Sequence, residues 1–223
     1  MTFQNLAIAS RQNDTKVNLM KKLSLTTLLF TALLLPLSAQ PGSKGTMKHS
    51  TPPASDPVYI SESALPKGWP APGPFNQVSR KEYPAYRAAF TPNDSPNGGF
   101  WTLFKHIQRN NIPMTSPVEM KMTDSPKTGM TMEQMGFLYQ SPEVGKTGAD
   151  GESVTVRDVP ALSVLSYTWQ GPRDDAQIAK ARAAIDAVLV EKKLQATGYR
   201  IFGYNGPSVS RKKQTHELQA LLK

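Results

Sequence analysis

The sequence predicts an α+β domain in which two β-α-β-β halves form one pseudo-symmetric sheet or barrel with two flanking helices. Two observations support this prediction. Stretches with the period-2 alternation of half-buried strands are interrupted by two stretches with the 3.6-residue period of a helix. In addition, residues 81–86 (KEYPAY) and 157–162 (RDVPAL) share one order of basic, acidic, apolar, proline, alanine and apolar residues. Because each copy precedes a strand, a helix and further strands, the pattern indicates an internal repeat.

The first half begins with alternating residues over 76–90. Pro84 divides this stretch into two short strands or an edge strand with a kink. A turn cluster over 93–99 separates it from residues 100–109, whose apolar side chains recur at i, i+3, i+4 and i+7 and predict a short helix. Alternation predicts the remaining strands of this half at residues 118–122 and 132–140.

The second half follows a loop over 146–151. Two strands are predicted on either side of Pro160, at 154–159 and 161–169. A longer helix is predicted over 174–195, with Gly198 as its stop. Its apolar face consists of Ile178, Ala181, Ile185, Val188 and Leu189. The last strands are expected at residues 199–204 and 216–222.

The N-terminal region has the pattern of a secretory signal peptide. Met20 and two lysines precede an uncharged run over 23–37, and small residues follow it. The run is short for a membrane crossing, which takes about 20 apolar residues. We therefore expect residues 1–39 to be a leader with its true start at Met20, cleavage after Ala39, and a periplasmic or secreted protein with no stable membrane span.

The exported part divides by composition. Residues 40–74 are rich in Pro, Gly, Ser and Thr and are expected to form a disordered tether. Residues 75–223 have the size of one ordinary domain, which we expect to be a monomer.

Charge and cysteine content exclude several function classes. The chain carries 26 Lys and Arg against 17 Asp and Glu, and without residues 1–39 the balance is 22 against 16. Export separates the protein from nucleic acid, and no basic motif with interleaved aromatic residues is present, so no nucleic-acid partner is expected. The chain has no cysteine, which excludes disulfides, thiolate metal sites and cysteine nucleophiles. No catalytic or nucleotide-binding motif occurs, so we predict a protein that is not an enzyme.

Two consecutive segments resemble a known family. Residues 100–107 (FWTLFKHI), followed by 112–118 (IPMTSPV), are similar to the core motif of the SOUL haem-binding proteins. Other stretches match in the same order, at 80–86, 135–139, 159–161, 204–207 and 216–218. The resemblance covers essentially all of residues 75–223. It implies a distorted antiparallel β-barrel of two pseudo-symmetric halves with two helices, and binding of haem or another tetrapyrrole in an apolar groove beside the first helix.

A haem site needs an apolar wall, cations for the two carboxylates and, optionally, a side chain on the iron. The candidate cofactor-binding residues are Phe100, Phe104, Lys105, His106, Arg109 and Met114. The phenylalanines would cover the macrocycle, and Lys105 or Arg109 would pair with its propionates. His106 is the candidate iron ligand, because the helical period places it on the flank of the apolar face, where that face meets solvent.

Two histidines depart from the family pattern. His106 stands where many members carry tyrosine, so an alternative interpretation is that it is only a surface residue at this position. His216 stands where asparagine is usual, and it is interpreted as a structural residue that forms hydrogen bonds.

Two other functions remain open. Six of the nine methionines lie between Met114 and Met135, and an exported, methionine-rich segment is suited to Cu(I), with Met120 and Met122 as candidate ligands. The same alternation is also what strands packed into a core show. The second alternative is a cofactor-free module that binds a small ligand or another protein on the same scaffold.

Overall fold

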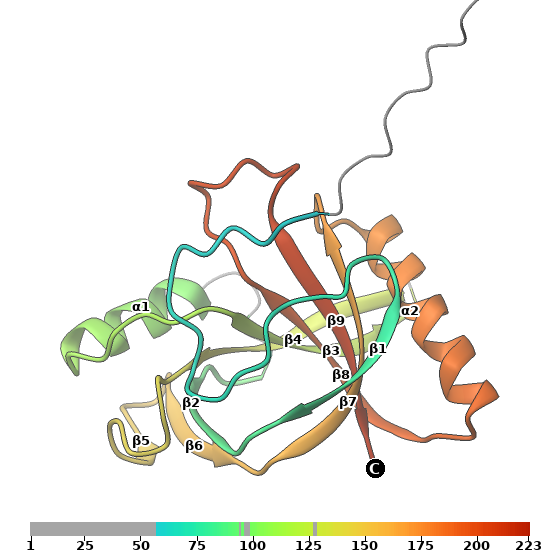
Figure 1. Ribbon diagram of the computed structural model, residues 1–223. Coiled ribbons are helices and arrows are strands. Elements are labelled where there is room, and N and C mark those ends of the chain that lie inside the picture. Colours follow the sequence, from blue (N-terminus) through green and yellow to red (C-terminus); the bar gives the residue numbers. More distant parts are fainter. Residues whose placement is uncertain (1–56, 94, 96–98, 127–128) are drawn as a thin grey trace, which may run out of the picture. The chain divides into compact units, whose positions relative to one another are not determined.

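The computed structural model describes residues 57–93, 95, 99–126 and 129–223 (Figure 1). These residues form nine strands and two helices. In chain order they are β1 (Val78–Tyr83), β2 (Tyr86–Phe90), α1 (Gly99–Arg109), β3 (Val118–Ser125), β4 (Gly129–Leu138), β5 (Gly148–Ala149), β6 (Thr155–Val159), β7 (Leu162–Gln170), α2 (Asp175–Glu191), β8 (Ala196–Gly203) and β9 (Thr215–Leu222). The predicted leader and the first part of the predicted tether lie outside the described residues.

The strands form one antiparallel sheet in the order β1-β7-β9-β8-β3-β4-β2-β6-β5. Strands β1, β2, β3 and β4 of the first half correspond to β6, β7, β8 and β9 of the second half. If β5 is left out and each strand is replaced by its counterpart, the same order results, read in the opposite direction. The predicted internal repeat is therefore present in the sheet. The strand pairing gives a second check. Tyr83 pairs with Leu162, and Tyr86 pairs with Val159. Val159 lies 76 residues after Tyr83, and Leu162 lies 76 residues after Tyr86, so the two pairs are equivalent in the two halves. The shift is the one that aligns the two sequence copies.

The α+β class and the two flanking helices are confirmed, but the prediction of a barrel is wrong. Among the described residues the sheet is open, with β1 and β5 as its edge strands. β1 and β6, which are equivalent in the two halves, lie toward opposite ends of the order. β1 pairs only with β7, and the free side of β6 takes the two-residue strand β5.

The helices and the strands share one core face. Leu103 and Ile107 of α1 pack with Phe137 of β4, while Ile185 and Leu189 of α2 pack over the middle of the sheet. This burial confirms the apolar faces predicted from the helical period. Neither helix of the described part combines the length and apolarity that a membrane crossing requires.

The opposite face of the sheet is covered by residues 57–77, which we call the N-terminal strap and which cross the sheet in cyan in Figure 1. The side chain of Trp69 is 7% exposed, and its ring centre lies 4.6 Å from that of Tyr83 and 5.1 Å from that of Tyr86. The Lys67 amide donates to the Gln140 carbonyl at 2.8 Å. Residues 57–74 therefore do not behave as the disordered tether that their composition predicted, because one buried tryptophan and backbone hydrogen bonds hold them on the sheet.

The second helix ends earlier than predicted. It stops at Glu191, and Lys192 caps it by donating its amide to the carbonyls of Val188 and Val190. Lys193 then takes a positive φ of 54° and turns the chain. Gly198, the predicted stop, lies inside β8 instead.

Candidate functional site

A groove of about 360 Å³ opens beside the first turn of α1. Its floor belongs to β3, β4 and β9, and its outer wall is the connection between β8 and β9. The apolar side chains that line it are Phe100, Val118, Met120, Met135 and Pro207. The polar ones are Arg173, Asn205, Arg211, Gln214 and His216. This combination of an apolar wall with a few polar groups is typical of a small-molecule site.

His216 is the distinctive residue of this groove. It is 6% exposed, and neither of its ring nitrogens has a hydrogen-bond partner among the described residues. Its ring centre lies 5.5 Å from that of Trp169. Burial, followed by the charge of Arg173, lowers the pKa of His216 to about 4, so the imidazole is neutral at pH 7. A buried polar group without a partner usually costs about 1–3 kcal/mol, and such a group calls for a structural or functional explanation.

The orientation of His216 follows from its neighbour in β9. Side chains alternate along a strand, so His216, Leu218 and Ala220 face the helix side, while Glu217 faces the strap side. Glu217 is fully buried and is fixed by several hydrogen bonds. Since a one-residue slip would reverse both faces, the contacts of Glu217 hold His216 toward the groove.

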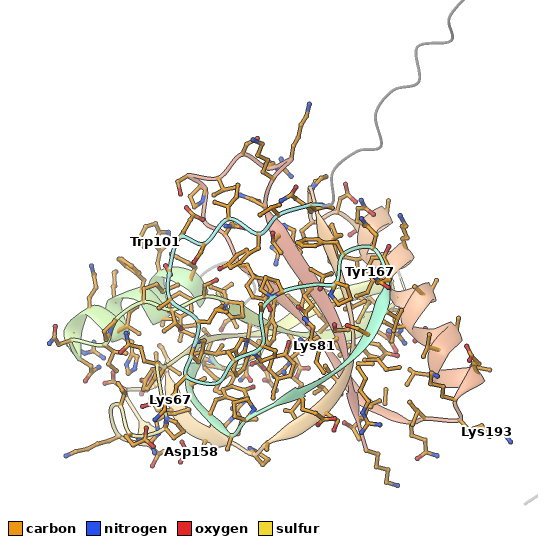
Figure 2. The ribbon with its side chains drawn as sticks, in the orientation of Figure 1. Lys67, Lys81, Trp101, Asp158, Tyr167 and Lys193 are labelled. Carbon is orange, nitrogen blue, oxygen red and sulfur yellow. The ribbon has the colours of Figure 1, made fainter. Side chains whose placement is uncertain are left out.

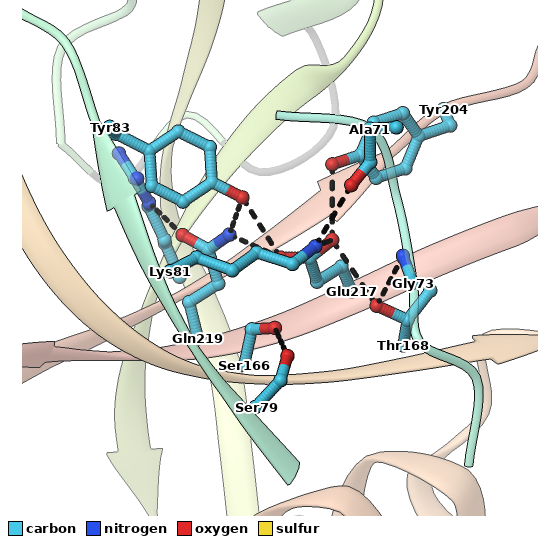
Figure 3. Close-up of polar contacts among 11 residues, drawn as sticks. Ala71, Gly73, Ser79, Lys81, Tyr83, Ser166, Thr168, Tyr204, Glu217 and Gln219 are labelled. Atoms are coloured by element: carbon cyan, nitrogen blue, oxygen red, sulfur yellow. Dashed lines mark hydrogen bonds and ion pairs between the residues drawn. The ribbon is translucent and has the colours of Figure 1, made fainter. Parts of the chain in front are cut away.

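The contacts of Glu217 form a polar cluster under the strap (Figure 3). Its carboxylate accepts from Lys81 Nζ at 2.8 Å and from the hydroxyls of Tyr83 and Tyr204 at 3.0 and 3.1 Å. Thr168 and Gln219 donate to it as well, at 3.2 and 2.6 Å. Both carboxylate oxygens are therefore saturated with donors, which assigns this cluster to the stability of the sheet.

Two guanidinium groups line the groove, Arg173 and Arg211. Arg173 donates to the Met120 sulfur, and within the described part of the chain neither arginine is paired with a carboxylate. Unpaired guanidinium groups at the edge of an apolar surface suit a ligand that carries carboxylates.

The structure separates the six residues predicted from sequence. Phe100 lines the groove, and Phe104 stacks on it with ring centres 6.0 Å apart. Phe104 and Met114 are half-buried against the core between α1 and β4. Lys105 is exposed, and the remaining two, His106 and Arg109, lie at a different cavity or its edge.

His106 is not at a boundary with solvent, as the helical period suggested, but buried. Its Nδ1 atom is hydrogen-bonded to the Asp150 carboxylate, and its Nε2 atom lies 2.7 Å from the Tyr139 hydroxyl. Both nitrogens are thus occupied, and iron would have to displace one of these partners. Burial raises the pKa of Tyr139 to about 12, which keeps this phenol protonated as a donor.

Asp150 ties the turn between β5 and β6 to the end of α1. Arg109 Nη2 donates to it at 2.5 Å, and the hydrogen bonds of Arg109 and His106 lower the pKa of Asp150 to about 2. A cavity of about 540 Å³ lies beside these residues. Since His106, Tyr139 and Asp150 are hydrogen-bonded to one another, they fix the segment that carries Asp150 against α1.

The available metal donors are few. Among the described residues no three His, Asp or Glu side chains cluster as a metal site would require. A tetrapyrrole supplies four nitrogen ligands of its own, so one imidazole from the protein suffices for its iron. The apolar wall and the two arginines of the groove fit the ring and the carboxylates of such a group, whereas both ring nitrogens of His216 are buried below its surface.

Sequence reasoning missed His216 as a site residue, although a signal was present. The alternation over 216–222 places it on the same face as Leu218 and Ala220, with no acidic or hydroxyl side chain of that strand beside it. A histidine at such a position has no local hydrogen-bond partner.

Comparisons with known proteins agree on the fold. An uncharacterised conserved protein from Listeria innocua has a TM-score of 0.51 at 13% identity, over 67% of this chain and 94% of that one. A second Listeria innocua protein, described as a hydrolase, has a TM-score of 0.50 at 9% identity, over 68% of this chain and 94% of that one. These likenesses show the fold alone. No curated protein matches the chain.

The family assignment comes from the sequence. A family model described as "SOUL heme-binding protein" matches residues 74–219, which include both helices, all nine strands except the end of β9, and every residue that lines the groove. The chain therefore belongs to the SOUL haem-binding protein family.

Proposed function

We propose that this protein binds haem or a related tetrapyrrole, without catalysing a reaction, in the groove beside α1. The family supports tetrapyrrole binding in general. The observation that carries the proposal for this groove is an apolar wall that meets two guanidinium groups, neither of which has a carboxylate partner in the part of the chain that the structure describes. A flat apolar ring with two carboxylates has the complementary chemistry.

In this proposal Phe100, Val118 and Met135 contact the face of the macrocycle, and Arg173 and Arg211 hold its carboxylates. Phe104 supports Phe100 from behind through their stacked rings. Lys105 and Arg109 were the expected propionate partners, but Arg109 is engaged with Asp150, and neither lines the groove. The two arginines of the groove are therefore the better candidates.

The test is a titration of the purified protein with hemin, followed by the Soret band. We expect saturable binding, which weakens by about tenfold when Arg173 and Arg211 are both replaced by glutamine. The matched control is Lys180→Gln, which removes an exposed cation from α2, away from the groove. The proposal is wrong if micromolar hemin leaves the spectrum unchanged, or if the control weakens binding as much as the double variant.

Binding of Cu(I) by Met120 and Met122 is a weaker candidate. Both side chains are buried in the core over α2, and Met120 accepts a hydrogen bond from the Arg173 guanidinium. A cation next to a thioether opposes a bare metal ion and favours an anionic ligand. A cofactor-free module would be indicated if neither hemin nor metal-free porphyrin bound.

Export to the periplasm or the medium is part of the same proposal. It rests on the signal-peptide pattern of residues 20–39. N-terminal sequencing of the protein recovered from a secreting cell should begin at Gln40. A protein that retains Met20 and stays inside the cell would contradict it.

A further inference from the structure

We infer that the end of the domain around the β8–β9 connection (residues 204–214) docks onto the surface of a bilayer that contains anionic lipids. The inference goes beyond the proposed function and does not depend on whether a tetrapyrrole binds. It starts from the exposed large apolar side chains of the described residues, which are Val58, Ile60, Phe100, Trp101 and Val190. All of them except Val190, which belongs to α2, lie around this one connection.

The strap brings two of these side chains to the connection. Ile60 is held there because its carbonyl accepts from Asn205 Nδ2 at 2.7 Å. The Val58 carbonyl accepts from Gln170 Nε2 at 3.0 Å, and Gln170 pairs with Thr215, the residue that follows the connection. The backbone of the strap is thus fixed here while both apolar side chains remain exposed to solvent.

The first turn of α1 brings the other two. Phe100 lines the groove together with Arg211 of the connection, and the ring centre of Trp101 lies 5.5 Å from that of Phe100. In Figure 2, Trp101 lies at the start of α1, beside the β8–β9 connection that Figure 1 draws in red. Its side chain is 65% exposed although it is one of the largest apolar groups of the chain.

The connection supplies positive charge between these two segments. It carries Arg211, Lys212 and Lys213, and it contains no acidic residue. All three cations are exposed, and within the described residues none of them is paired with a carboxylate. Glu62 of the strap, which accepts from a backbone amide of the connection at 2.8 Å, adds one negative charge. The balance remains positive, and it suits the negative potential of an anionic bilayer.

A bilayer fits this arrangement better than a protein partner does. The exposed apolar side chains stand on two segments, with the cations of the connection between them. A stable protein interface needs a continuous, closely packed surface, whereas a lipid interface accepts separate apolar tips. Tryptophan favours the level at which headgroups meet acyl chains, and lysine and arginine stay among the phosphates. Since neither described helix suits a membrane crossing, the contact would be peripheral.

Tryptophan fluorescence of the full, tetrapyrrole-free chain provides the test. The chain has three tryptophans, and Trp69 and Trp169 are 7% and 1% exposed, so a response to lipid reports on Trp101. Vesicles of equal parts phosphatidylcholine and phosphatidylglycerol should shift the emission to the blue, and brominated acyl chains should quench it. Vesicles of phosphatidylcholine alone should bind at least about tenfold more weakly.

The cations are tested with matched triple variants. Replacing Arg211, Lys212 and Lys213 by glutamine should weaken binding to the anionic vesicles at least about tenfold. The control replaces Lys180, Lys192 and Lys193, which are three exposed cations in and after α2, and should bind within about twofold of the wild type.

The apolar contribution is tested by co-sedimentation with the same vesicles. Trp101→Gln should weaken binding about tenfold, whereas Val190→Gln, which changes an equally exposed apolar side chain on α2, should leave it unchanged.

Three outcomes would overturn the inference: no blue shift with anionic vesicles, equal loss of binding in both triple variants, or equal loss in Trp101→Gln and Val190→Gln. A blue shift that grows with protein concentration in the absence of lipid would also overturn it, because it would assign this surface to a second copy of the chain. Every substituted side chain is exposed, so an unchanged Tm verifies that the variants are folded.

Discussion

Replacing Lys81 with methionine tests whether the polar cluster under the strap depends on its internal ion pair. Figure 2 places Lys81 inside the domain, whereas Lys193 points outward at the end of α2. The Lys81 ammonium lies 2.8 Å from Glu217, and their side chains are 8% and 0% exposed. It also donates to the Ala71 carbonyl of the strap at 3.2 Å.

The expected cost follows from what remains after the change. Methionine fills most of the space but leaves the Glu217 carboxylate buried with only neutral donors in contact. Breaking a buried ion pair in this way typically costs about 3–5 kcal/mol. For a domain of this size, 1 kcal/mol lowers the Tm by about 2–4 °C, so the variant should melt roughly 6–20 °C below the wild type.

The control is the neighbouring residue. Arg80→Met breaks the Arg80–Glu82 pair, whose side chains are 59% and 66% exposed, and an exposed pair contributes about 1 kcal/mol at most. Denaturant unfolding of both variants gives the comparison. If Lys81→Met costs no more than Arg80→Met, the carboxylate does not depend on the ammonium and the reasoning is wrong. The double variant Lys81→Met/Glu217→Gln should cost less than the sum of the single changes, because it leaves no unpaired charge.

Three further predictions concern packing and pH. Gly136→Ala should lower the free energy of unfolding by about 1–3 kcal/mol, because the new Cβ would lie 2.6 Å from a ring carbon of Phe90. Gly198→Ala, whose Cβ would lie 4.0 Å from its nearest neighbour, should lower it by less than about 1 kcal/mol. Equal costs in denaturant unfolding would contradict this. Asp150 has a lowered pKa, so its contribution to stability is complete above pH 3.8 and is lost as the pH falls to about 2. Asp150→Asn should make the free energy of unfolding less dependent on pH in that window. An unchanged pH dependence would show that the hydrogen bonds of Asp150 to His106 and Arg109 do not stabilise the fold. His216 also has a lowered pKa, so between pH 6.5 and about 4 the unfolded chain takes up a proton that the folded protein does not. The free energy of unfolding therefore decreases as the pH is lowered through this range. His216→Gln should remove that part of the slope in ligand-free protein, and persistence of the full slope would refute it.

The strands and helices were predictable because their signals are local. Alternation located the strands on both sides of Pro84 and Pro160, and the helical period identified the buried faces of α1 and α2. The internal repeat was also visible, since the two copies keep the same pairing in the sheet. Closure was not predictable in this way, because it depends on whether the two outer strands meet.

The site was harder to predict, because it depends on contacts between distant residues. His106 lost its role as a candidate ligand through Asp150, a residue 44 positions away in a loop with no marked pattern. His216 stands out for the same kind of reason, because among the described residues no hydrogen-bond partner reaches its ring. The strap shows the same limit, since the burial of Trp69 depends on rings from β1, β2 and β8 that composition cannot anticipate.

The mirrored strand order has a consequence for where a ligand can bind. It creates the same kind of place twice, where a helix of one half faces the turn between two strands of the other half. Beside α2 the equivalent place is a cavity of about 350 Å³, lined by Asp124, Arg182 and Asp186 among others. There Arg182 is paired with both carboxylates, at 2.9 and 2.8 Å, so its guanidinium is not left without an anionic partner. One backbone plan therefore provides two hollows, and the side chains leave unmatched groups in the one beside α1.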